Sequence, residues 1–151
     1  DLPSSWPEKA TIRVAGESAR FSEIFARRGL SLDFGGSWLL PRLVGMHKAK
    51  ELAFFADILS AREAERMGLV NRVVPDAELD AFVADWAERL STSAPLALQL
   101  SKKLLSNAFS IGLSEALDAE AAAQSVNLVS EDTKEGVRAF LEKRKPAFRG
   151  R

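Results

Sequence analysis

The sequence places one acid in a setting that suits either proton transfer or helix capping. Asp33 lies in GLSLDFGGSWLLPRLVG, residues 29–45, between Leu32 and Phe34 and directly before a pair of glycines. A carboxylate with apolar neighbours is expected to be partly desolvated, which suits a group that accepts and returns protons. A carboxylate before a helix can equally accept hydrogen bonds from the first N–H groups of that helix. Both interpretations of Asp33 stay open at this point.

The composition argues against several other kinds of site. Cysteine is absent and His47 is the single histidine, so thiolate chemistry is excluded and no metal site is expected. His47 stands among polar residues in GMHKAKEL, where we expect a solvated surface side chain. Basic and acidic residues number 21 each, so no net charge directs the chain to nucleic acid or to an anionic membrane. The apolar runs are far shorter than the roughly 18 residues of a membrane span, and we expect a cytoplasmic protein.

The elements that must position Asp33 are mostly helices. Apolar residues at helical spacing, together with caps, prolines and glycines, predict helices over residues 35–44, 48–56, 60–68, 76–90, 93–109, 114–128 and 130–143. Ser60 and Glu63 have the spacing of a capping box at the start of one of them.

Only short segments are predicted as strands. β-Branched residues favour strands over residues 11–15 and 69–74, while residues 19–26 suit either a helical turn or a strand. Two or three isolated strands do not form a stable sheet, so the first strand needs neighbours that the chain does not clearly supply. Pattern alone therefore predicts a mostly helical domain and leaves its function open.

Three ordered segments resemble one enzyme family. They are SARFSEIFARRGLSLDFGGSWLLPRLVGMHKAKEL at residues 18–52, ILSAREAERMGLVNRVVP at residues 58–75, and SEDTKEGVRAFLEKRKPAFRGR at residues 130–151. Over residues 12–151 the chain resembles the enoyl-CoA hydratase/isomerase family, the crotonase superfamily. The stretch around Asp33 is most similar to the ring-opening isomerases of phenylacetyl-CoA degradation and their double-bond-shifting relatives.

The resemblance implies a fold and an assembly. The expected fold is a mostly α fragment of the α/β crotonase fold, a ClpP/crotonase-like spiral, with short N-terminal strands before a helical C-terminal trimerisation region. The corresponding divisions are an irregular lead-in at residues 1–11, the end of the spiral core with the active-site loop and helix at residues 12–74, and the helical oligomerisation region at residues 75–151. A homo-trimer or hexamer is expected.

The resemblance also implies a reaction on acyl-CoA thioesters, in which coenzyme A is part of the substrate and no further cofactor is needed. In the family, two backbone N–H groups stabilise the charge that develops on the thioester oxygen. The segments that carry them should precede Ile12, and DLPSSWPEKAT does not supply them. Losing one such donor costs about 10²–10³ in rate, so we expect the chain alone to be inactive or nearly so.

The resemblance assigns roles residue by residue. Family hydratases carry a glutamate where this sequence has Phe25, which argues against two-glutamate hydration chemistry. Several family isomerases carry an aspartate at the position of Asp33, which would then move a proton between carbons of an enolate. Leu32, Phe34, Trp38 and Phe25 are candidates for the acyl pocket, with ordinary core packing as the alternative, which is favoured for Trp38.

The C-terminal residues form a second candidate site. In the family, residues matching Phe140 and Lys143 lie near the adenine and phosphates of coenzyme A bound to a neighbouring subunit. An aromatic face suits adenine and an ammonium suits phosphate, although a solvated basic helix end has the same composition. Three functions stay open: a double-bond isomerase using Asp33, an enoyl-CoA hydratase, and a non-catalytic helical assembly module.

Overall fold

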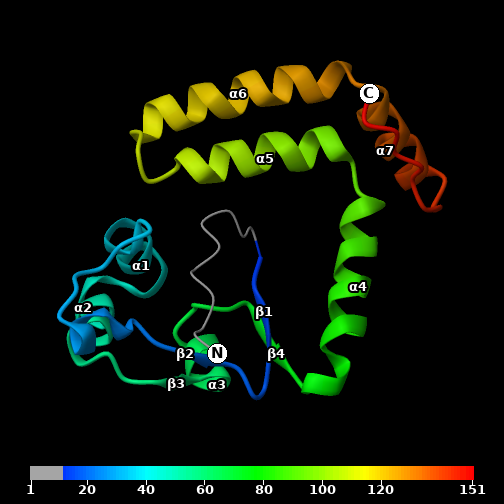
Figure 1. Ribbon diagram of the computed structural model, residues 1–151. Coiled ribbons are helices and arrows are strands. Elements are labelled where there is room, and N and C mark those ends of the chain that lie inside the picture. The colour runs from blue at the N-terminus through cyan, green and yellow to red at the C-terminus, as the bar shows by residue number, and fades with distance from the viewer. Residues whose placement is uncertain (1–11) are drawn as a thin grey trace. The chain divides into compact units, whose positions relative to one another are not determined.

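The chain forms two compact units in the computed structural model, which describes residues 12–151. The units are Asp1–Ala84 and Asp85–Arg151, and their boundary falls within helix α4, Leu79–Ser91. The predicted irregular lead-in, residues 1–11, lies outside the described residues. The predicted division after residue 74 stays a prediction. Each unit is described by itself below (Figure 1).

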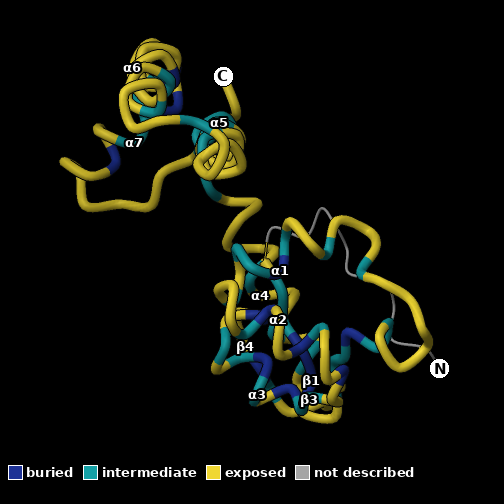
Figure 2. The backbone as a smooth tube through the Cα atoms, turned by 90° about the vertical axis from the view of Figure 1, so that its left-hand side faces the viewer, coloured by how far each residue is buried: buried dark blue, intermediate teal, exposed yellow. Residues whose placement is uncertain are grey.

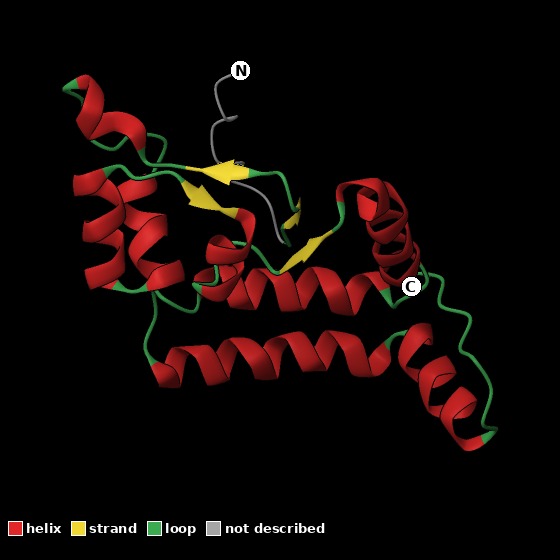
Figure 3. Cartoon of the chain, turned by 90° about the horizontal axis from the view of Figure 1, so that it is seen from below, coloured by secondary structure: helices red, strands yellow, loops and turns green. Residues whose placement is uncertain are grey.

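The first unit contains two short pairs of strands. In one pair, β1 runs parallel to β4 with Val14 opposite Arg72, and in the other β2 runs antiparallel to β3 with Phe21 opposite Leu59. Figure 3 shows how small these strands are beside the helices. Their bounds are Val14–Gly16, Arg20–Phe21, Leu59–Ser60 and Arg72–Val74 for β1 to β4. The ambiguous stretch of residues 19–26 thus holds β2 and the start of a 3₁₀ helix.

Short helices connect these strands, and local signals explain where they begin. They are the 3₁₀ helix η1, Ile24–Arg28, and the α-helices α1, Gly36–Val44, α2, Met46–Phe55, and α3, Ala61–Arg66. The predicted capping box opens α3: Ser60 Oγ accepts from the Glu63 N–H at 3.3 Å, and the Glu63 carboxylate accepts from the Ser60 N–H at 2.8 Å. Gly45 separates α1 from α2.

The core of the first unit lies where α3 packs against the strands. Leu69 is its largest fully buried side chain, and Ala61 and Ala64 of α3 are also fully buried. Small side chains on α3 let the helix approach β4 closely, and Figure 2 shows buried residues concentrated in this unit. The cluster consists of Ala15, Leu40, Ala49, Leu52, Ala61, Ala64, Leu69, Val70 and Val73.

The second unit is helical. The 3₁₀ turn η2, Asp76–Glu78, and α4 lead into it from the first unit. The unit then contains α5, Pro95–Asn107, α6, Leu113–Val129, and α7, Glu131–Leu141. Figure 1 shows α5 alongside α6, and the two helices contact each other. The small side chains of the alanine-rich middle of α6 do not fill the space between them. They leave an apolar groove of about 360 Å³ that Leu100, Leu104 and Ala123 line.

The C-terminal segment, residues 142–151, folds back along α7. Ser130 caps α7 by accepting from the Thr133 N–H at 3.1 Å. The helix ends at Leu141, two residues before the predicted Lys143, because Lys143 adopts the left-handed conformation with φ at 53°. We call residues 142–151 the tail.

Candidate active site

Asp33 lies on the loop between η1 and α1, and its side chain is exposed. Within residues 12–151 its carboxylate accepts no hydrogen bond, while its backbone carbonyl accepts from the Gly36 N–H at 2.8 Å. The N-cap of α1 is Gly35, which has no side chain to cap with. The capping alternative for Asp33 is therefore wrong, and its carboxylate is available to other partners.

The backbone after Asp33 is strained. Phe34 has φ at 47° and Gly35 has φ at 76°, so two successive residues are left-handed. Glycine adopts this conformation freely, whereas a phenylalanine does so at a steric cost. Residues held in such geometry concentrate at functional sites, which makes this turn a reasonable place for chemistry.

The apolar neighbours of Asp33 do not cover it. Leu32 is half-buried and lies against Gly36, and Phe34 is 58% exposed. The desolvation expected from these flanking residues is therefore wrong for the chain by itself. Neighbours in sequence shield a carboxylate only when their side chains turn toward it, and here the left-handed Phe34 turns the loop instead.

A small hollow beside this loop contains charged side chains that the sequence did not assign. Arg13, Glu23 and Phe34 line it with residues from α1, and its volume is about 10 Å³. Glu23 is only 4% exposed, and burial lowers the pKa of Arg13. Glu23 stands two positions before Phe25, the position of the family's glutamate, so the resemblance does not point to it. Residues of α1, more than ten positions later in the sequence, line the same hollow as Glu23.

The four predicted acyl-pocket residues differ in their surroundings, and their shared role stays a prediction. Phe34 lines the hollow beside Glu23, while Phe25, Leu32 and Trp38 do not. Trp38 is 47% exposed, and the Arg42 guanidinium lies 3.7 Å from its ring centroid. The core-packing interpretation that was favoured for Trp38 is therefore wrong, because the indole stacks with a cation at the surface. Phe25 and Leu32 are half-buried.

The second candidate site lies at the end of α7. Phe140 is 83% exposed and Lys143 is also exposed, so both are available to a ligand. Behind them, Glu135 accepts two hydrogen bonds from the Arg144 guanidinium, at 2.6 and 3.0 Å. This bidentate contact and the Ala147 N–H lower the pKa of Glu135 from its usual 4.5 to about 2, and the same contact raises the pKa of Arg144.

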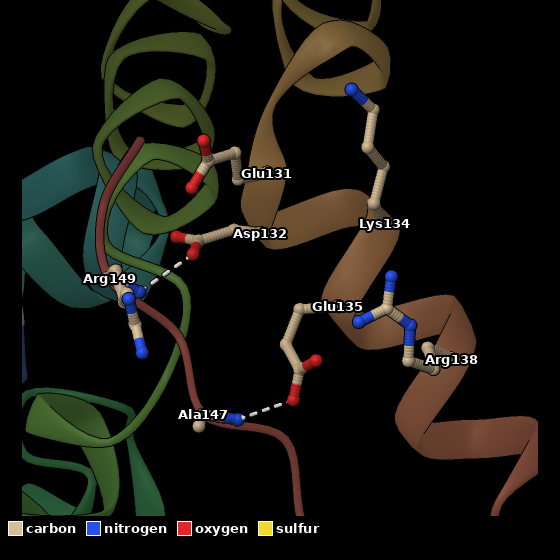
Figure 4. A pocket seen from close by; sticks show the side chains of 7 residues that line it. All are labelled: Glu131, Asp132, Lys134, Glu135, Arg138, Ala147 and Arg149. Carbon is tan, nitrogen blue, oxygen red and sulfur yellow. Dashed lines mark hydrogen bonds between the residues drawn. The ribbon is translucent and has the colours of Figure 1, made fainter.

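A polar pocket of about 350 Å³ lies between α7 and the tail (Figure 4). Two of its acids are used to hold the tail: Asp132 accepts from the Arg149 N–H at 2.7 Å and Glu135 accepts from the Ala147 N–H at 2.9 Å. This pocket was not predicted, because the contacts form only when the tail reverses direction.

The described residues contain no cluster of metal-ligating side chains, and His47 is exposed as expected. None of the helices between residues 12 and 151 combines the length and apolar character needed to cross a membrane.

Comparison with known proteins tests the resemblance directly. A family model described as enoyl-CoA hydratase/isomerase matches residues 9–151. A Rhodobacter capsulatus protein named "Probable enoyl-CoA hydratase" is 43% identical over 146 residues, which cover 94% of this chain and 55% of that protein. The 1,2-epoxyphenylacetyl-CoA isomerase of Escherichia coli is 39% identical over 140 residues, 93% of this chain and 53% of the enzyme.

Solved structures agree with these relatives. A crystal structure of an enoyl-CoA hydratase subunit from Geobacillus kaustophilus matches with a TM-score of 0.90 and 37% identity, covering 95% of this chain and 56% of that one. The chain spans about half the length of the curated relatives it matches. The predicted fold class is confirmed: the described residues form a mostly helical part of the crotonase fold. With a family model matched over nearly its whole length and close relatives in sequence and structure, this chain belongs to the enoyl-CoA hydratase/isomerase family.

Proposed function

We propose that the protein formed with this chain isomerises double bonds in acyl-CoA thioesters, with Asp33 as the proton carrier. One observation carries the proposal: the Asp33 carboxylate is exposed, accepts no hydrogen bond within residues 12–151, and stands at a strained turn before α1. A carboxylate without hydrogen-bond donors can accept a proton, and the strained turn sets the position of that carboxylate.

The reaction is a proton transfer in two steps. The ionised Asp33 removes a proton from a carbon made acidic by the thioester, and the electron pair passes into the enolate. The protonated Asp33 then returns the proton to another carbon of the conjugated system, which moves the double bond and regenerates the carboxylate. The N-terminal end of α1 follows Asp33 by three residues, so the acid stands at the start of a helix.

Isomerisation is favoured over hydration by the residue at the position of the hydratase glutamate. That position is Phe25, whose side chain neither donates nor accepts a proton. Hydration by the family pattern needs a second acid to activate water, whereas isomerisation needs only the one acid that shuttles a proton. The similarity to a 1,2-epoxyphenylacetyl-CoA isomerase supports the same choice.

Hydration is the second candidate, and the names of relatives favour it. A crotonyl-CoA hydratase of Syntrophomonas wolfei and a short-chain-enoyl-CoA hydratase of Clostridium acetobutylicum are each 40% identical to this chain. Glu23 is the buried acid nearest in sequence to Phe25. If the protein hydrates its substrate, Glu23 is the candidate for the second acid, and it would need to face the attacking water.

Two further parts of the proposal concern ligand and partner. Phe140 and Lys143 contact the adenine and phosphates of coenzyme A, and their exposure supports this role. The chain assembles as a homo-trimer or hexamer, supported by apolar side chains that the second unit leaves more than half exposed: Leu105, Phe109, Leu113, Leu117, Leu128, Val129, Val137 and Leu141. A purely structural assembly module would share this surface and lack the reaction.

The test uses a chimera in which the N-terminal part of the R. capsulatus relative precedes residues 12–151. With a 3-enoyl-CoA and with crotonyl-CoA as substrates, mass spectrometry separates isomerisation from the gain of one water. Asp33→Asn should slow isomerisation by about 10²–10⁴-fold, the usual contribution of one acid–base group. The matched control is Asp57→Asn, an exposed acid of the same unit that pairs with Arg27. Equal rates for Asp33→Asn and the unaltered chimera would remove Asp33 from the mechanism.

A further inference from the structure

Helix α7 ends in a left-handed residue that is a lysine. The Lys143 N–H donates to the Phe140 carbonyl at 3.2 Å, and the Arg144 N–H donates to the Ala139 carbonyl at 3.0 Å. These two bonds form a Schellman motif in which Lys143, with φ at 53°, takes the position that glycine usually occupies. A side chain with a Cβ is sterically unfavourable there. Something must therefore hold Lys143 in this conformation.

The next residue is anchored through its entire guanidinium group. Arg144 donates from both terminal nitrogens to the two carboxylate oxygens of Glu135, and from Nε to Glu142 at 2.6 Å. A bidentate arginine–carboxylate contact fixes direction as well as distance. Glu135 belongs to α7, so this contact ties the residue after the turn to the helix before it.

The same carboxylate anchors the chain beyond the turn. Glu135 Oε1 accepts from the Ala147 N–H at 2.9 Å, as Figure 4 shows. The segment from Arg144 to Ala147 is thus held at both ends by Glu135. We call Glu135, Arg144 and the Ala147 N–H the clamp. With the following residues fixed by the clamp, Lys143 can relax to a right-handed conformation only if the clamp opens.

We propose that Glu135 and Arg144 are positioning residues for coenzyme A, because the clamp holds Lys143 in the left-handed conformation from which its ammonium meets a phosphate. This inference rests on the proposed coenzyme A role of Lys143. It assigns no ligand contact to Glu135, because both oxygens of its carboxylate already accept hydrogen bonds from Arg144 or Ala147. The clamp acts on the ligand only through Lys143.

The test is a double-mutant cycle in the chimera described above, with affinity for coenzyme A measured by calorimetry near neutral pH. Lys143→Gly keeps the turn and removes the ammonium, so it should weaken binding roughly tenfold, the effect of one lost charge-assisted contact. Glu135→Gln should weaken binding by a similar factor when Lys143 is present. In the Lys143→Gly background it should have no further effect, because no ammonium is left to position.

The controls separate positioning from general stability. Glu131 lies on the same helix as Glu135 and forms an ion pair with Arg151 of the tail. Glu131→Gln breaks this ion pair and should leave the affinity for coenzyme A unchanged. Arg144→Lys keeps the charge and loses the bidentate contact, so it should weaken binding even if Glu135→Gln fails to fold, which circular dichroism would reveal.

The possible results distinguish the two proposals. If the unaltered chimera binds coenzyme A and Lys143→Gly leaves its affinity unchanged, the proposed coenzyme A site is refuted and the positioning role falls with it. If Lys143→Gly weakens binding while Glu135→Gln and Arg144→Lys do not, the positioning role alone is refuted. Equal losses for Glu135→Gln in both backgrounds would mean that the clamp supports the fold and does not act through Lys143.

Discussion

Replacement of Asp132 by asparagine tests how the tail is held to the second unit. The Asp132 side chain is buried, and one of its oxygens accepts from the Arg149 N–H at 2.7 Å, as Figure 4 shows. Its other oxygen accepts from the Gly150 N–H at 2.8 Å. The Asp132 N–H itself donates to the Arg151 carbonyl at 3.1 Å. One residue in the first turn of α7 thus bonds each of the last three residues.

The expected loss follows from what asparagine retains. Its amide keeps one acceptor oxygen and points an NH₂ group at the other backbone N–H, so one charge-assisted hydrogen bond is lost, worth about 1.5–3 kcal/mol. The variant also loses a negative charge at the N-terminal end of α7, worth about 0.3–1 kcal/mol. Together these terms lower the free energy of unfolding of the second unit by about 2–4 kcal/mol.

Urea unfolding followed by circular dichroism measures this loss, and hydrogen exchange at the Arg149 and Gly150 amides locates it. The matched control is Glu131→Gln, because Glu131 is the preceding residue and makes only an exposed ion pair with Arg151. That change should cost at most about 1 kcal/mol. If the two variants lose equal stability, or if the Arg149 and Gly150 amides exchange no faster in Asp132→Asn, then the buried carboxylate does not hold the tail.

Three further changes have defined outcomes. Phe25→Glu in the chimera should raise the ratio of hydration to isomerisation of crotonyl-CoA and a 3-enoyl-CoA, because it restores an acid at the hydratase position; an unchanged product ratio would count against that alignment. Glu135 has a pKa of about 2 in the folded chain against a usual 4.5, so its stabilising contribution is complete above pH 4.5 and disappears as pH falls toward 2. Urea midpoints between pH 2 and 6 should therefore fall less steeply in Glu135→Gln than in the unaltered chain, and parallel curves would contradict the low pKa. Leu69→Ala should lower the unfolding free energy of the first unit by about 2–5 kcal/mol, since Leu69 is fully buried, whereas Leu30→Ala at a 62% exposed position should change it by less than about 0.5 kcal/mol; similar losses in urea would refute the described core.

The helices could be predicted because their signals are local. Ser60 and Glu63 stand three residues apart, and the structure contains both hydrogen bonds of the capping box that this spacing predicts. Pro95 begins α5 at the position where a proline is tolerated, and Ser130 caps α7. The strand pairing could not be predicted in the same way, because β1 and β4 pair directly although several helices separate them in the sequence.

The candidate sites were predicted in part. The exposure of Phe140 and the loop position of Asp33 are consistent with the roles that the resemblance suggests, and those roles stay predictions. The sequence did not indicate the contact between Glu135 and Arg144, because it closes only across the reversal after Leu141. The stacking of Arg42 on Trp38 was also missed, although the two residues are four apart on one helix face and this spacing could have indicated it.

Left-handed backbone geometry links the two candidate sites by a physical argument. Within residues 12–151, three residues other than glycine have positive φ: Phe34, Ala56 and Lys143. Ala56 is fully buried at the end of α2. Phe34 and Lys143 are exposed. The left-handed conformation costs each residue about 1–2 kcal/mol, a cost that a glycine at the same position would avoid. Burial does not account for the left-handed conformation of either exposed residue. The contacts proposed above, with the acyl group beside Asp33 and with a coenzyme A phosphate at Lys143, would account for both.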